Sequence, residues 1–372
     1  MTDRTRDLHY MTLALRLAAK GQGTTSPNPM VGAVVVRQGR IVGQGFHLRP
    51  GAAHAEILAL QQSGTQARGA TLYVTLEPCC HLKKRTPPCV PDILRSGVSR
   101  VVIAMQDPNP SVQGKGIAAL RKAGLSVTVD VARSEAEKLN KAYGHWMKTG
   151  RPYVTLKAGM TLDGQLATAS GDSRWITGEL SRKEVHQLRS TVDAVLVGVG
   201  TVVIDDPSLT ARTGSGLKKL ASRQPLRLVV DSRLRIPLKA LVLTQQDRAK
   251  TIVATTDAAP SAQRSALQKK GIEVLIVPVI HGHVSLSALL KELGRRGITS
   301  LLVEGGGEVN AAMLKAKLVD HVRLYMAPLL LGGQNARGVI GGESPARLTG
   351  AMKLQHVTTR FVGNDLVVEG DL

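Results

Sequence analysis

The sequence is poor in cysteine, in aromatic residues and in long apolar runs. Its three cysteines, an odd number in 372 residues, argue against a disulfide framework and favour the reducing cytoplasm. Only two Trp, five Tyr and two Phe are present, which opposes binding of single-stranded nucleic acid by base stacking. No apolar run approaches the roughly 18 to 20 residues that span a bilayer. We therefore expect neither a membrane span nor a secretory signal.

Acidic residues are also scarce relative to basic ones. The 49 Lys and Arg against 28 Asp and Glu give a formal net charge of +21. Residues 1–149 hold 20 basic and 9 acidic side chains and so carry +11, which leaves +10 for the remainder. The even division excludes a basic tail. Such a charge attracts polyanions, whether nucleic acid, anionic membrane or phosphorylated metabolites.

The length predicts two domains, because one hydrophobic core seldom organises so long a chain. In the first part, helical periodicity is expected over residues 7–20, 54–62, 91–96 and 115–123. Strands are expected at 31–36, 41–46, 71–76, 100–104 and 126–129. This alternation is typical of a three-layer α/β domain. One connecting helix over 133–148 should end at the glycine and proline of 149–152, so the domains are expected at 1–149 and 150–372.

The second part also alternates strands with helices. Strands are expected at 153–158, 194–199, 226–231, 251–254, 273–277, 300–304, 322–327 and 361–369. Helices are expected at 181–191, 260–270, 285–295 and 308–317. The pattern predicts a second α/β domain. Its closing strands, after Val319, lack intervening helices and are expected to pair antiparallel.

One histidine and two Pro-Cys pairs form the first candidate site. His54-Ala55-Glu56 begins a predicted helix, and Cys79 and Cys89 each follow a proline downstream of the strand at 71–76. A catalytic zinc takes three such protein ligands and leaves one position for a water, whose pKa it lowers. A carboxylate that is not a ligand, here Glu56, can then move protons during a deamination. Cys80 or His81 could instead supply a fourth ligand, which would make the zinc structural.

A glycine cluster forms the second candidate site. Gly305-Gly306-Gly307 lies between an apolar run that ends at Glu304 and the predicted helix at 308–317. Glycines between a strand and a helix let backbone N–H groups approach a pyrophosphate. The spacing is not Gly-x-Gly-x-x-Gly, so a plain turn is the alternative.

Several segments of the first part resemble the deaminase domain of the bifunctional riboflavin-biosynthesis deaminase/reductase family. They are residues 25–32, 54–56, 75–79 and 85–89. The resemblance implies a cytidine-deaminase-like three-layer α/β/α fold, with Glu56 as the catalytic proton shuttle. The residues that it implies for zinc are His54, Cys79 and Cys89, and those for the substrate are Asn28, His81 and Arg85.

The loop between the cysteine ligands departs from related patterns. Nine residues separate Cys79 from Cys89, whereas cytidine and nucleic-acid deaminases typically have two residues between their cysteines. The loop is also one residue longer than is usual in the family that the sequence resembles. Cys80 could therefore replace Cys79 as the second ligand, although Cys79 is favoured because it directly follows Glu77-Pro78.

The second part resembles the reductase domain of the same family, which implies a dihydrofolate-reductase-like α/β fold that uses NADPH. The segments that carry this resemblance are 157–164, 173–177, 200–202, 205–207, 209–212, 230–232 and 304–307. The implied cofactor residues are Gly159, Trp175, Thr201, Asp205, Ser232, Gly306 and Gly307. The implied substrate residues are Ser173, Arg189, Leu209, Arg212 and Glu304. Both arginines suit a phosphate, because a guanidinium pairs bidentately with phosphate oxygens.

Together the two resemblances imply consecutive reactions of riboflavin biosynthesis. The first is hydrolytic deamination of 2,5-diamino-6-ribosylamino-4(3H)-pyrimidinone 5′-phosphate, and the second is NADPH-dependent reduction of the ribosyl group to ribityl. The expected partner is this phosphorylated pyrimidine, with no nucleic acid and no membrane, and a homo-oligomer is expected. Two alternatives are a zinc-dependent nucleic-acid base deaminase with an accessory α/β domain, and a non-catalytic scaffold with structural zinc.

Overall fold

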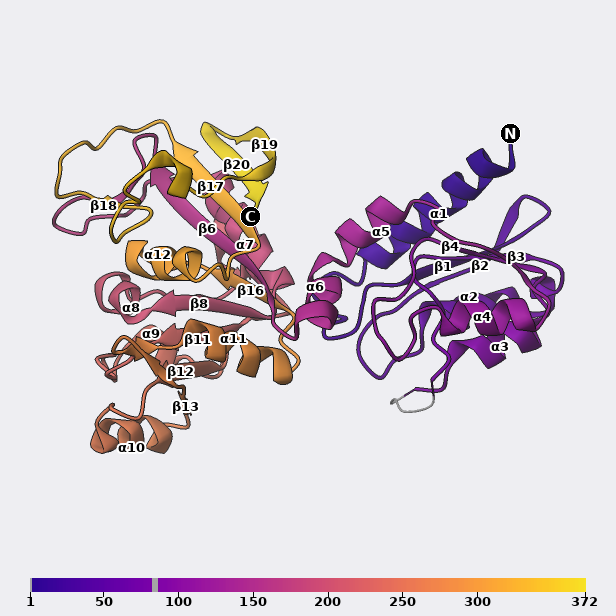
Figure 1. The fold of residues 1–372 in the computed structure, drawn as a ribbon, viewed down its shortest axis with the longest axis horizontal. Coiled ribbons are helices and arrows are strands. Elements are labelled where there is room, and N and C mark those ends of the chain that lie inside the picture. Colours follow the sequence, from indigo (N-terminus) through magenta and orange to yellow (C-terminus); the bar gives the residue numbers. More distant parts are fainter. Residues whose placement is uncertain (1, 82–85) are drawn as a thin grey trace. The chain divides into compact units, whose positions relative to one another are not determined.

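The computed structural model describes residues 2–81 and 86–372. The chain divides into two compact units, Met1–Gly150 and Arg151–Leu372 (Figure 1). No helix in the described ranges is both long and apolar enough to cross a membrane.

The N-terminal unit is built on a five-stranded sheet in the order β2-β1-β3-β4-β5. β1 pairs antiparallel with β2 and β3, and the pairs β3–β4 and β4–β5 are parallel. Helices α1 and α5 lie on one face of the sheet, and α2, α3 and α4 lie on the other (Figure 1). The elements are α1 (Asp3–Ala19), β1 (Gly32–Arg37), β2 (Arg40–Phe46), α2 (Ala55–Ser63), β3 (Thr71–Val74), α3 (Cys89–Ser96), β4 (Arg100–Ile103), α4 (Lys115–Lys122), β5 (Ser126–Thr128), α5 (Arg133–Leu139) and α6 (Lys141–Thr149).

Alternating side chains of the central strands fill two separate cores. Along β1, Val34 and Val36 pack against α1, whereas Ala33 and Val35 pack on the opposite face, against α2. A strand that is buried on both faces needs an almost continuous apolar run, which is what residues 33–36 provide. The expected three-layer α/β/α arrangement is confirmed.

The C-terminal unit is built on a nine-stranded sheet in the order β13-β12-β11-β8-β16-β6-β17-β20-β19. Neighbouring strands are parallel from β13 to β17, and β17–β20 and β20–β19 are antiparallel. Its elements are β6 (Tyr153–Thr161), β7 (Gln165–Ala167), α7 (Glu179–Thr191), β8 (Ala194–Gly198), α8 (Val199–Asp205), β9 (Arg212–Thr213), β10 (Lys219–Leu220), β11 (Leu226–Val230), α9 (Leu241–Thr244), β12 (Thr251–Thr255), α10 (Ser261–Lys269), β13 (Glu273–Ile276), β14 (Val279–Ile280), β15 (His283–Val284), α11 (Leu286–Arg295), β16 (Ser300–Val303), α12 (Gly307–Lys315), β17 (His321–Ala327), β18 (Arg337–Gly338), β19 (Gln355–Val362) and β20 (Asp365–Asp371).

Helices cover both faces of this second sheet. On one face the core includes Leu289 from α11 and Met313 from α12. On the other it includes Val202 from α8 and Leu267 from α10. A mostly parallel sheet with helices on both faces confirms the α/β fold expected for this part of the chain.

The expected single helix over 133–148 is wrong, because the chain forms two helices with a break at Asn140. This buried residue leaves the helical conformation, with φ −102° and ψ 25°. Its side-chain Nδ2 donates to the carbonyl oxygen of Met30 at 2.9 Å, and its Oδ1 accepts from the Met30 N–H at 2.8 Å. One amide thus satisfies two backbone groups that lie 110 residues away, a partner that local periodicity could not show.

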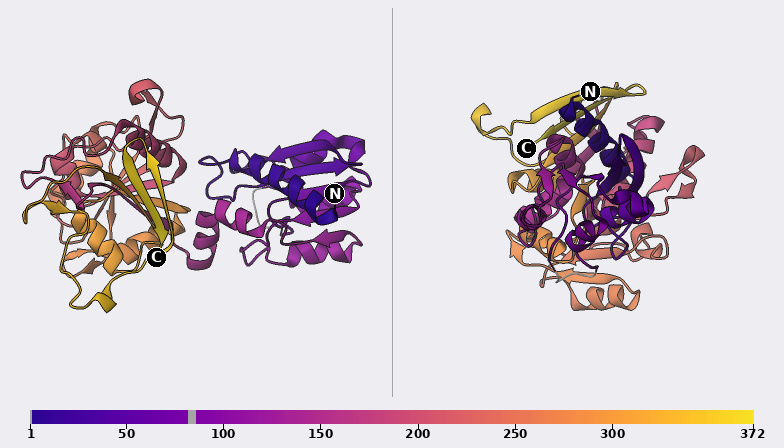
Figure 2. Two further views of the ribbon diagram at one scale, coloured as in Figure 1. Left: turned by 90° about the horizontal axis from the view of Figure 1, so that it is seen from above. Right: turned by 90° about the vertical axis from the view of Figure 1, so that its right-hand side faces the viewer.

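The expected single strand at 361–369 is also wrong, because it contains a hairpin. Val362 pairs with Asp365, so Gly363 and Asn364 form a two-residue turn, and Gly363 has φ 62°. Glycine and asparagine are favoured in such turns because they tolerate positive φ. The resulting β19–β20 hairpin, yellow in Figure 2, lies at the periphery of the C-terminal unit. The antiparallel pairing expected after Val319 is confirmed for β17–β20 and β20–β19, whereas β17–β6 is parallel.

Candidate active sites

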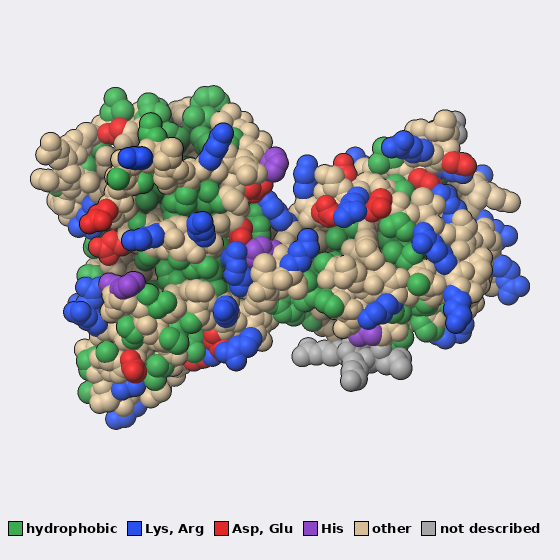
Figure 3. Space-filling view, viewed as in Figure 1, with side chains coloured by type: hydrophobic (Ala, Val, Ile, Leu, Met, Phe, Trp, Pro, Cys, Tyr) green, Lys and Arg blue, Asp and Glu red, His purple; other side chains and the backbone are tan. Residues whose placement is uncertain are grey.

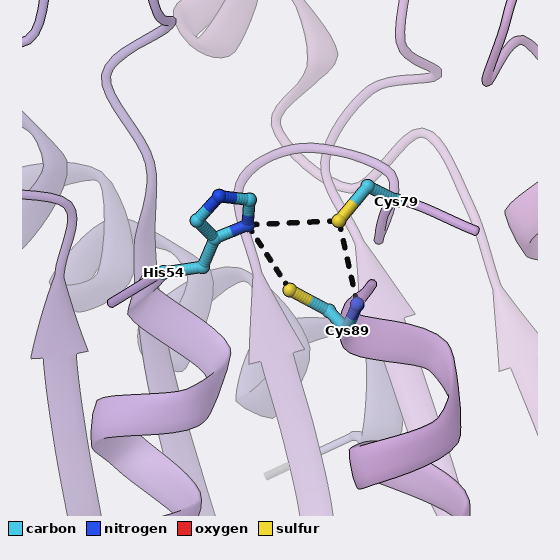
Figure 4. A group of neighbouring side chains, drawn as sticks. All are labelled: His54, Cys79 and Cys89. Carbon is cyan, nitrogen blue, oxygen red and sulfur yellow. Dashed lines mark hydrogen bonds between the residues drawn. The ribbon is translucent and has the colours of Figure 1, made fainter. Parts of the chain in front are cut away.

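Three elements of the N-terminal unit bring His54, Cys79 and Cys89 together (Figure 4). His54 directly precedes α2, Cys79 follows β3, and Cys89 is the first residue of α3. The three potential ligand atoms all lie within 4.8 Å of one another. His54 Nδ1 is 3.1 Å from Cys89 Sγ and 3.6 Å from Cys79 Sγ.

This geometry and donor set fit zinc. With Zn–S near 2.3 Å and Zn–N near 2.0 Å, ligand atoms of a tetrahedral site lie about 3.5 Å apart. The Nε2 of His54 contacts the hydroxyl of Thr86 at 3.0 Å, which leaves Nδ1 to face the two sulfur atoms. Cys80 is not part of the group that the described residues form. The three described side chains that could hold a zinc ion are therefore His54, Cys79 and Cys89.

The backbone at the start of α3 also supports the cysteine ligands. The Cys89 N–H donates to Cys79 Sγ at 3.4 Å (Figure 4) and to the Cys79 carbonyl oxygen at 3.0 Å. An N–H group that points at sulfur favours the thiolate, which is the form that binds metal. The same contact fixes the two cysteines relative to each other.

Glu56 lies beside the cluster as the second residue of α2. Its side chain is buried, and burial raises the pKa of Glu56, as does the neighbouring Cys79 thiolate. His54 and a hydrogen bond with Cys89 act in the opposite direction. The net effect is a carboxyl group that holds a proton more readily than an exposed glutamate does, as a proton shuttle requires.

Asn28 is separated from the candidate zinc ligand His54 by one imidazole ring, that of His47. Asn28 Nδ2 is 3.0 Å from His47 Nε2, and the His47 and His54 ring centroids are 5.3 Å apart. Burial lowers the pKa of His47. Sequence reasoning missed His47, whose only local signal is its position in the loop between β2 and His54.

The other expected deaminase residues lie in the loop after Cys79. His81 is half-buried, and its Nδ1 has no hydrogen-bond partner among the described residues. Arg85 lies outside the described residues.

Glu77 is a further residue that sequence reasoning missed. Its buried carboxylate accepts the N–H groups of Asp107 at 3.2 Å, Gly114 at 2.9 Å and Ile117 at 3.1 Å. It therefore fastens the loop that carries Cys79 to the start of α4. Its position directly after a buried strand was the available signal.

In the C-terminal unit, three of the expected cofactor residues follow three adjacent parallel strands. Ser232 follows β11, Thr201 lies in α8 directly after β8, and Gly306 follows β16. The carboxyl edge of such a sheet is where ligands bind in open α/β folds. Thr201 Oγ1 would be 3.7 Å from a Cβ on Gly306, and a Cβ on Gly307 would be only 2.6 Å from the Gly338 carbonyl oxygen. The start of α12 therefore requires glycine at 307.

The same edge carries a buried ion cluster around Glu304. Arg189 binds its carboxylate bidentately, with Nε–Oε1 at 2.6 Å and Nη2–Oε2 at 2.9 Å, and Lys157 Nζ is 3.5 Å from Oε2. Burial alone would raise the pKa of Glu304, but Arg189 and Lys157 hold it at about 2. Lys157 comes from β6, 147 positions away, and was not anticipated as a site residue.

Next to this cluster, the loop after α8 gathers basic side chains around Thr210. His186 Nδ1 and Arg189 Nη1 lie 3.0 and 3.2 Å from the Thr210 carbonyl oxygen. Arg212 reaches the hydroxyls of Thr210 at 3.3 Å and Ser208 at 3.0 Å. In the described part of the chain, Arg212 has no carboxylate partner. Leu209, which lies between Ser208 and Thr210 in the sequence, is buried and has a positive φ of 51°.

The other residues expected in the reductase site are Ser173, Asp205, Gly159 and Trp175. Ser173 Oγ donates to Asp205 Oδ1 at 3.0 Å, so these two lie together. A Cβ on Gly159 would be 3.1 Å from the methyl group of Thr177. The Trp175 ring is 69% exposed, and the Arg182 guanidinium lies 4.6 Å from its centroid.

Both units match known families. Residues 4–105 match the cytidine and deoxycytidylate deaminase zinc-binding region, and residues 152–368 match the RibD C-terminal domain. Fold and site thus define a zinc-binding deaminase domain joined to a RibD C-terminal domain. The chain belongs to the RibD family of riboflavin biosynthesis proteins. It is 44% identical to riboflavin biosynthesis protein RibD of Bacillus amyloliquefaciens over 358 residues, which cover 96% of this chain and 94% of that protein.

Other relatives are similar over their whole length. RibD of Escherichia coli K12 is 42% identical over 369 residues, which cover 97% of this chain and 98% of that protein. The solved structure of Acinetobacter baumannii RibD, form 1, has a TM-score of 0.89 at 36% identity and covers 100% of both chains. The Thermotoga maritima diaminohydroxyphosphoribosylaminopyrimidine deaminase/5-amino-6-(5-phosphoribosylamino)uracil reductase has a TM-score of 0.86 at 35% identity, covering 100% of this chain and 99% of that one.

Proposed function

We propose that this chain catalyses two successive steps of riboflavin biosynthesis. In residues 1–149, 2,5-diamino-6-ribosylamino-4(3H)-pyrimidinone 5′-phosphate loses an amino group by hydrolysis. In residues 150–372, the ribosyl group is reduced to ribityl with NADPH. The observation that carries the proposal is the cluster of His54, Cys79 and Cys89 with the buried Glu56 beside it. The similar Thermotoga protein, which is named as a deaminase and reductase, supports the proposal.

The deaminase chemistry follows from the position of Glu56. Zinc held by the three ligands supplies Lewis acidity and lowers the pKa of a water molecule. Glu56 takes one proton from the attacking water and passes it to the ring nitrogen, and it then transfers the remaining hydroxyl proton to the departing amine, which leaves as ammonia. Its raised pKa helps it to hold a proton between the two transfers. Asn28, His81 and Arg85 hold the substrate.

The two arginines of the reductase site have different roles. The Nε and Nη2 groups of Arg189 donate to the carboxylate of Glu304, so Arg189 positions that carboxylate and keeps it ionised. Arg212 has only hydroxyl partners, so its guanidinium binds the substrate 5′-phosphate. Ser173, Leu209 and Glu304 complete the substrate site.

NADPH supplies the hydride of the second reaction. The residues that hold it are Gly159, Trp175, Thr201, Asp205, Ser232, Gly306 and Gly307. The small residues at the carboxyl edge of the sheet let the backbone approach its pyrophosphate. The exposed ring of Trp175 is available for stacking on the cofactor.

We also propose that the chain is a homo-oligomer in the cytoplasm. β19 is an outermost strand of the nine-stranded sheet, it is exposed along nearly its whole length, and it carries the exposed Phe361. None of the three cysteines, all of which lie among the described residues, forms a disulfide, and a reducing compartment favours that state.

The test is to incubate the full-length protein with the diaminopyrimidine phosphate, with and without NADPH, while ammonia and NADPH oxidation are followed together. Wild type should release ammonia in both cases and oxidise NADPH only after deamination. E56Q should lose ammonia release by a factor of about 10² to 10⁴, the usual contribution of an acid–base group. It should keep its zinc and should reduce pre-deaminated substrate normally.

The matched control is E135Q, which changes an exposed glutamate on α5. It should behave as wild type in both assays. Normal ammonia release by E56Q would contradict the role of Glu56. No ammonia from wild type would contradict the proposed function.

A further inference from the structure

His47 is a buried imidazole that bridges two groups of the deaminase unit. Its ring is 2% exposed. Nδ1 lies 3.3 Å from the carbonyl oxygen of Ala53, and Nε2 lies 3.0 Å from Nδ2 of Asn28. The backbone of His47 is fixed as well, because its N–H donates to the Val31 carbonyl oxygen at 2.9 Å. Both ring nitrogens and the backbone N–H of His47 therefore have partners.

These contacts determine which nitrogen carries the proton. A carbonyl oxygen can only accept, so Nδ1 must be the N–H that faces Ala53. In a neutral imidazole the other nitrogen, Nε2, is then an acceptor. The group of Asn28 that faces Nε2 must therefore be a donor, which is the amide NH₂.

The orientation of the Asn28 amide follows from this. With NH₂ turned to His47, the carbonyl oxygen Oδ1 points elsewhere, and no described residue donates to it. Asn28 lies one ring away from His54, since the His47 and His54 rings meet edge-on at 5.3 Å. A hydrogen-bond acceptor of fixed orientation is thus held near the zinc ligands.

We propose that His47 is a positioning residue that locks the Asn28 amide with Oδ1 directed at the substrate. The deaminase pocket then accepts a hydrogen bond from an N–H group of the diaminopyrimidine. A pyrimidine that presents a lone pair to Asn28 Oδ1, in place of an N–H group, is rejected because the amide oxygen would then have no hydrogen-bond donor. The inference rests on the proposed deamination and adds the group that sets its specificity.

The experiment is a double-mutant cycle on ammonia release by full-length protein, with wild type, H47L, N28A and H47L/N28A. H47L should lower kcat/KM about tenfold, which corresponds to one hydrogen bond. In the N28A background, H47L should change kcat/KM by less than about twofold, because no amide is left to position. H47Q should stay within about threefold of wild type, since a glutamine amide can donate to Ala53 and accept from Asn28.

Zinc content and the reductase rate with pre-deaminated substrate show whether each variant is intact, and both should be unchanged. Equal effects of H47L with and without Asn28 would overturn the positioning role. So would loss of zinc from H47L, or an H47Q that is as impaired as H47L. If H47L does not fold, the same cycle is measured with H47Q in place of H47L. An impaired H47Q would then overturn the positioning role of His47. Inactive wild type would instead overturn the proposed function.

Discussion

Arg189 and Arg212 carry the same charge on neighbouring segments, but their partners differ. The guanidinium of Arg189 is committed to Glu304, whereas that of Arg212 contacts only the hydroxyls of Ser208 and Thr210. We predict that R212M raises the KM of the reductase for pre-deaminated substrate by roughly 10- to 100-fold, since charged hydrogen bonds contribute about 1.5–3 kcal/mol. Its kcat should change little.

R189M should act differently, because it leaves Glu304 without its bidentate partner. It should mainly lower kcat. Steady-state NADPH oxidation separates the two parameters, and R248M, at an exposed arginine, is the control. The same change in KM for R189M and R212M would contradict the division of roles.

His186 predicts how the stability of the C-terminal unit depends on pH. Burial lowers the pKa of His186 to about 4, and the nearby Arg189 contributes. Between about pH 6.5 and 4 the unfolded chain binds this proton and the folded chain does not. The free energy of unfolding should therefore fall as the pH is lowered through this window.

Urea unfolding at pH 7.5, 6 and 5 measures this dependence. In H186N, whose amide can still donate to the Thr210 carbonyl, the fall should be smaller than in wild type. H283N, at an exposed histidine, is the control. An unchanged pH dependence in H186N would show that His186 is not the group responsible.

At the scale of elements, the break between α5 and α6 depends on one side chain. Asn140 is bonded to both backbone groups of Met30. N140A should lower the free energy of unfolding of the N-terminal unit by roughly 2–3 kcal/mol, because it leaves two backbone groups unsatisfied. N140D keeps the acceptor but places a buried carboxylate against the Met30 carbonyl oxygen, so it should be at least as destabilising as N140A.

Chemical denaturation of full-length protein, followed by circular dichroism, tests this, with K138A at an exposed position of α5 as the control. If N140A were as stable as K138A, the two hydrogen bonds would not stabilise the break.

The elements show what the sequence could and could not predict. Alternation of apolar and polar residues is local, so both α/β units and most of their strands could be predicted. The break at Asn140 could not, because Met30 lies 110 positions away. The hairpin at Gly363 was missed because an exposed strand such as β19 carries no alternating apolar pattern. The Gly-Asn pair was its one local signal.

The residues of the candidate sites also divide into those that the sequence could predict and those that it could not. Residues with a specific motif, such as His54 and Cys89, could be predicted because the ligand chemistry restricts residue type and spacing. His47, Glu77 and Lys157 were missed because their roles depend on partners from other elements. A single sequence does not indicate which distant segments come into contact.

At the scale of the whole molecule, the net charge of +21 is spread over both units. Figure 3 shows basic side chains scattered over the visible face of each unit. The proposed phosphorylated substrate and NADPH would account for basic residues at the candidate sites, such as Arg212. Local ion pairs, for example Arg189 with Glu304, neutralise part of the charge. The charge therefore favours anionic metabolites in general and does not by itself indicate a nucleic-acid partner.

The exposed edge of the C-terminal sheet makes the oligomeric state testable. Hydrophobic side chains reach the surface over the part of this unit that contains β18 to β20 (Figure 3). Phe361 on β19 is 74% exposed and Val357 is 53% exposed. An unpaired edge strand can join its own copy antiparallel about a two-fold axis, which covers both apolar side chains and backbone groups.

We therefore predict that wild type sediments as a dimer or larger assembly and that F361D shifts it toward the monomer, because burial of a carboxylate between two edges is unfavourable. Analytical ultracentrifugation over a range of concentrations measures this. L8D, which places the same charge at an exposed leucine of α1, should leave the assembly intact. If F361D and wild type had the same mass at every concentration, β19 would not be the interface. A shift in F361D alone would identify the outer strand of the sheet as the surface that joins the copies.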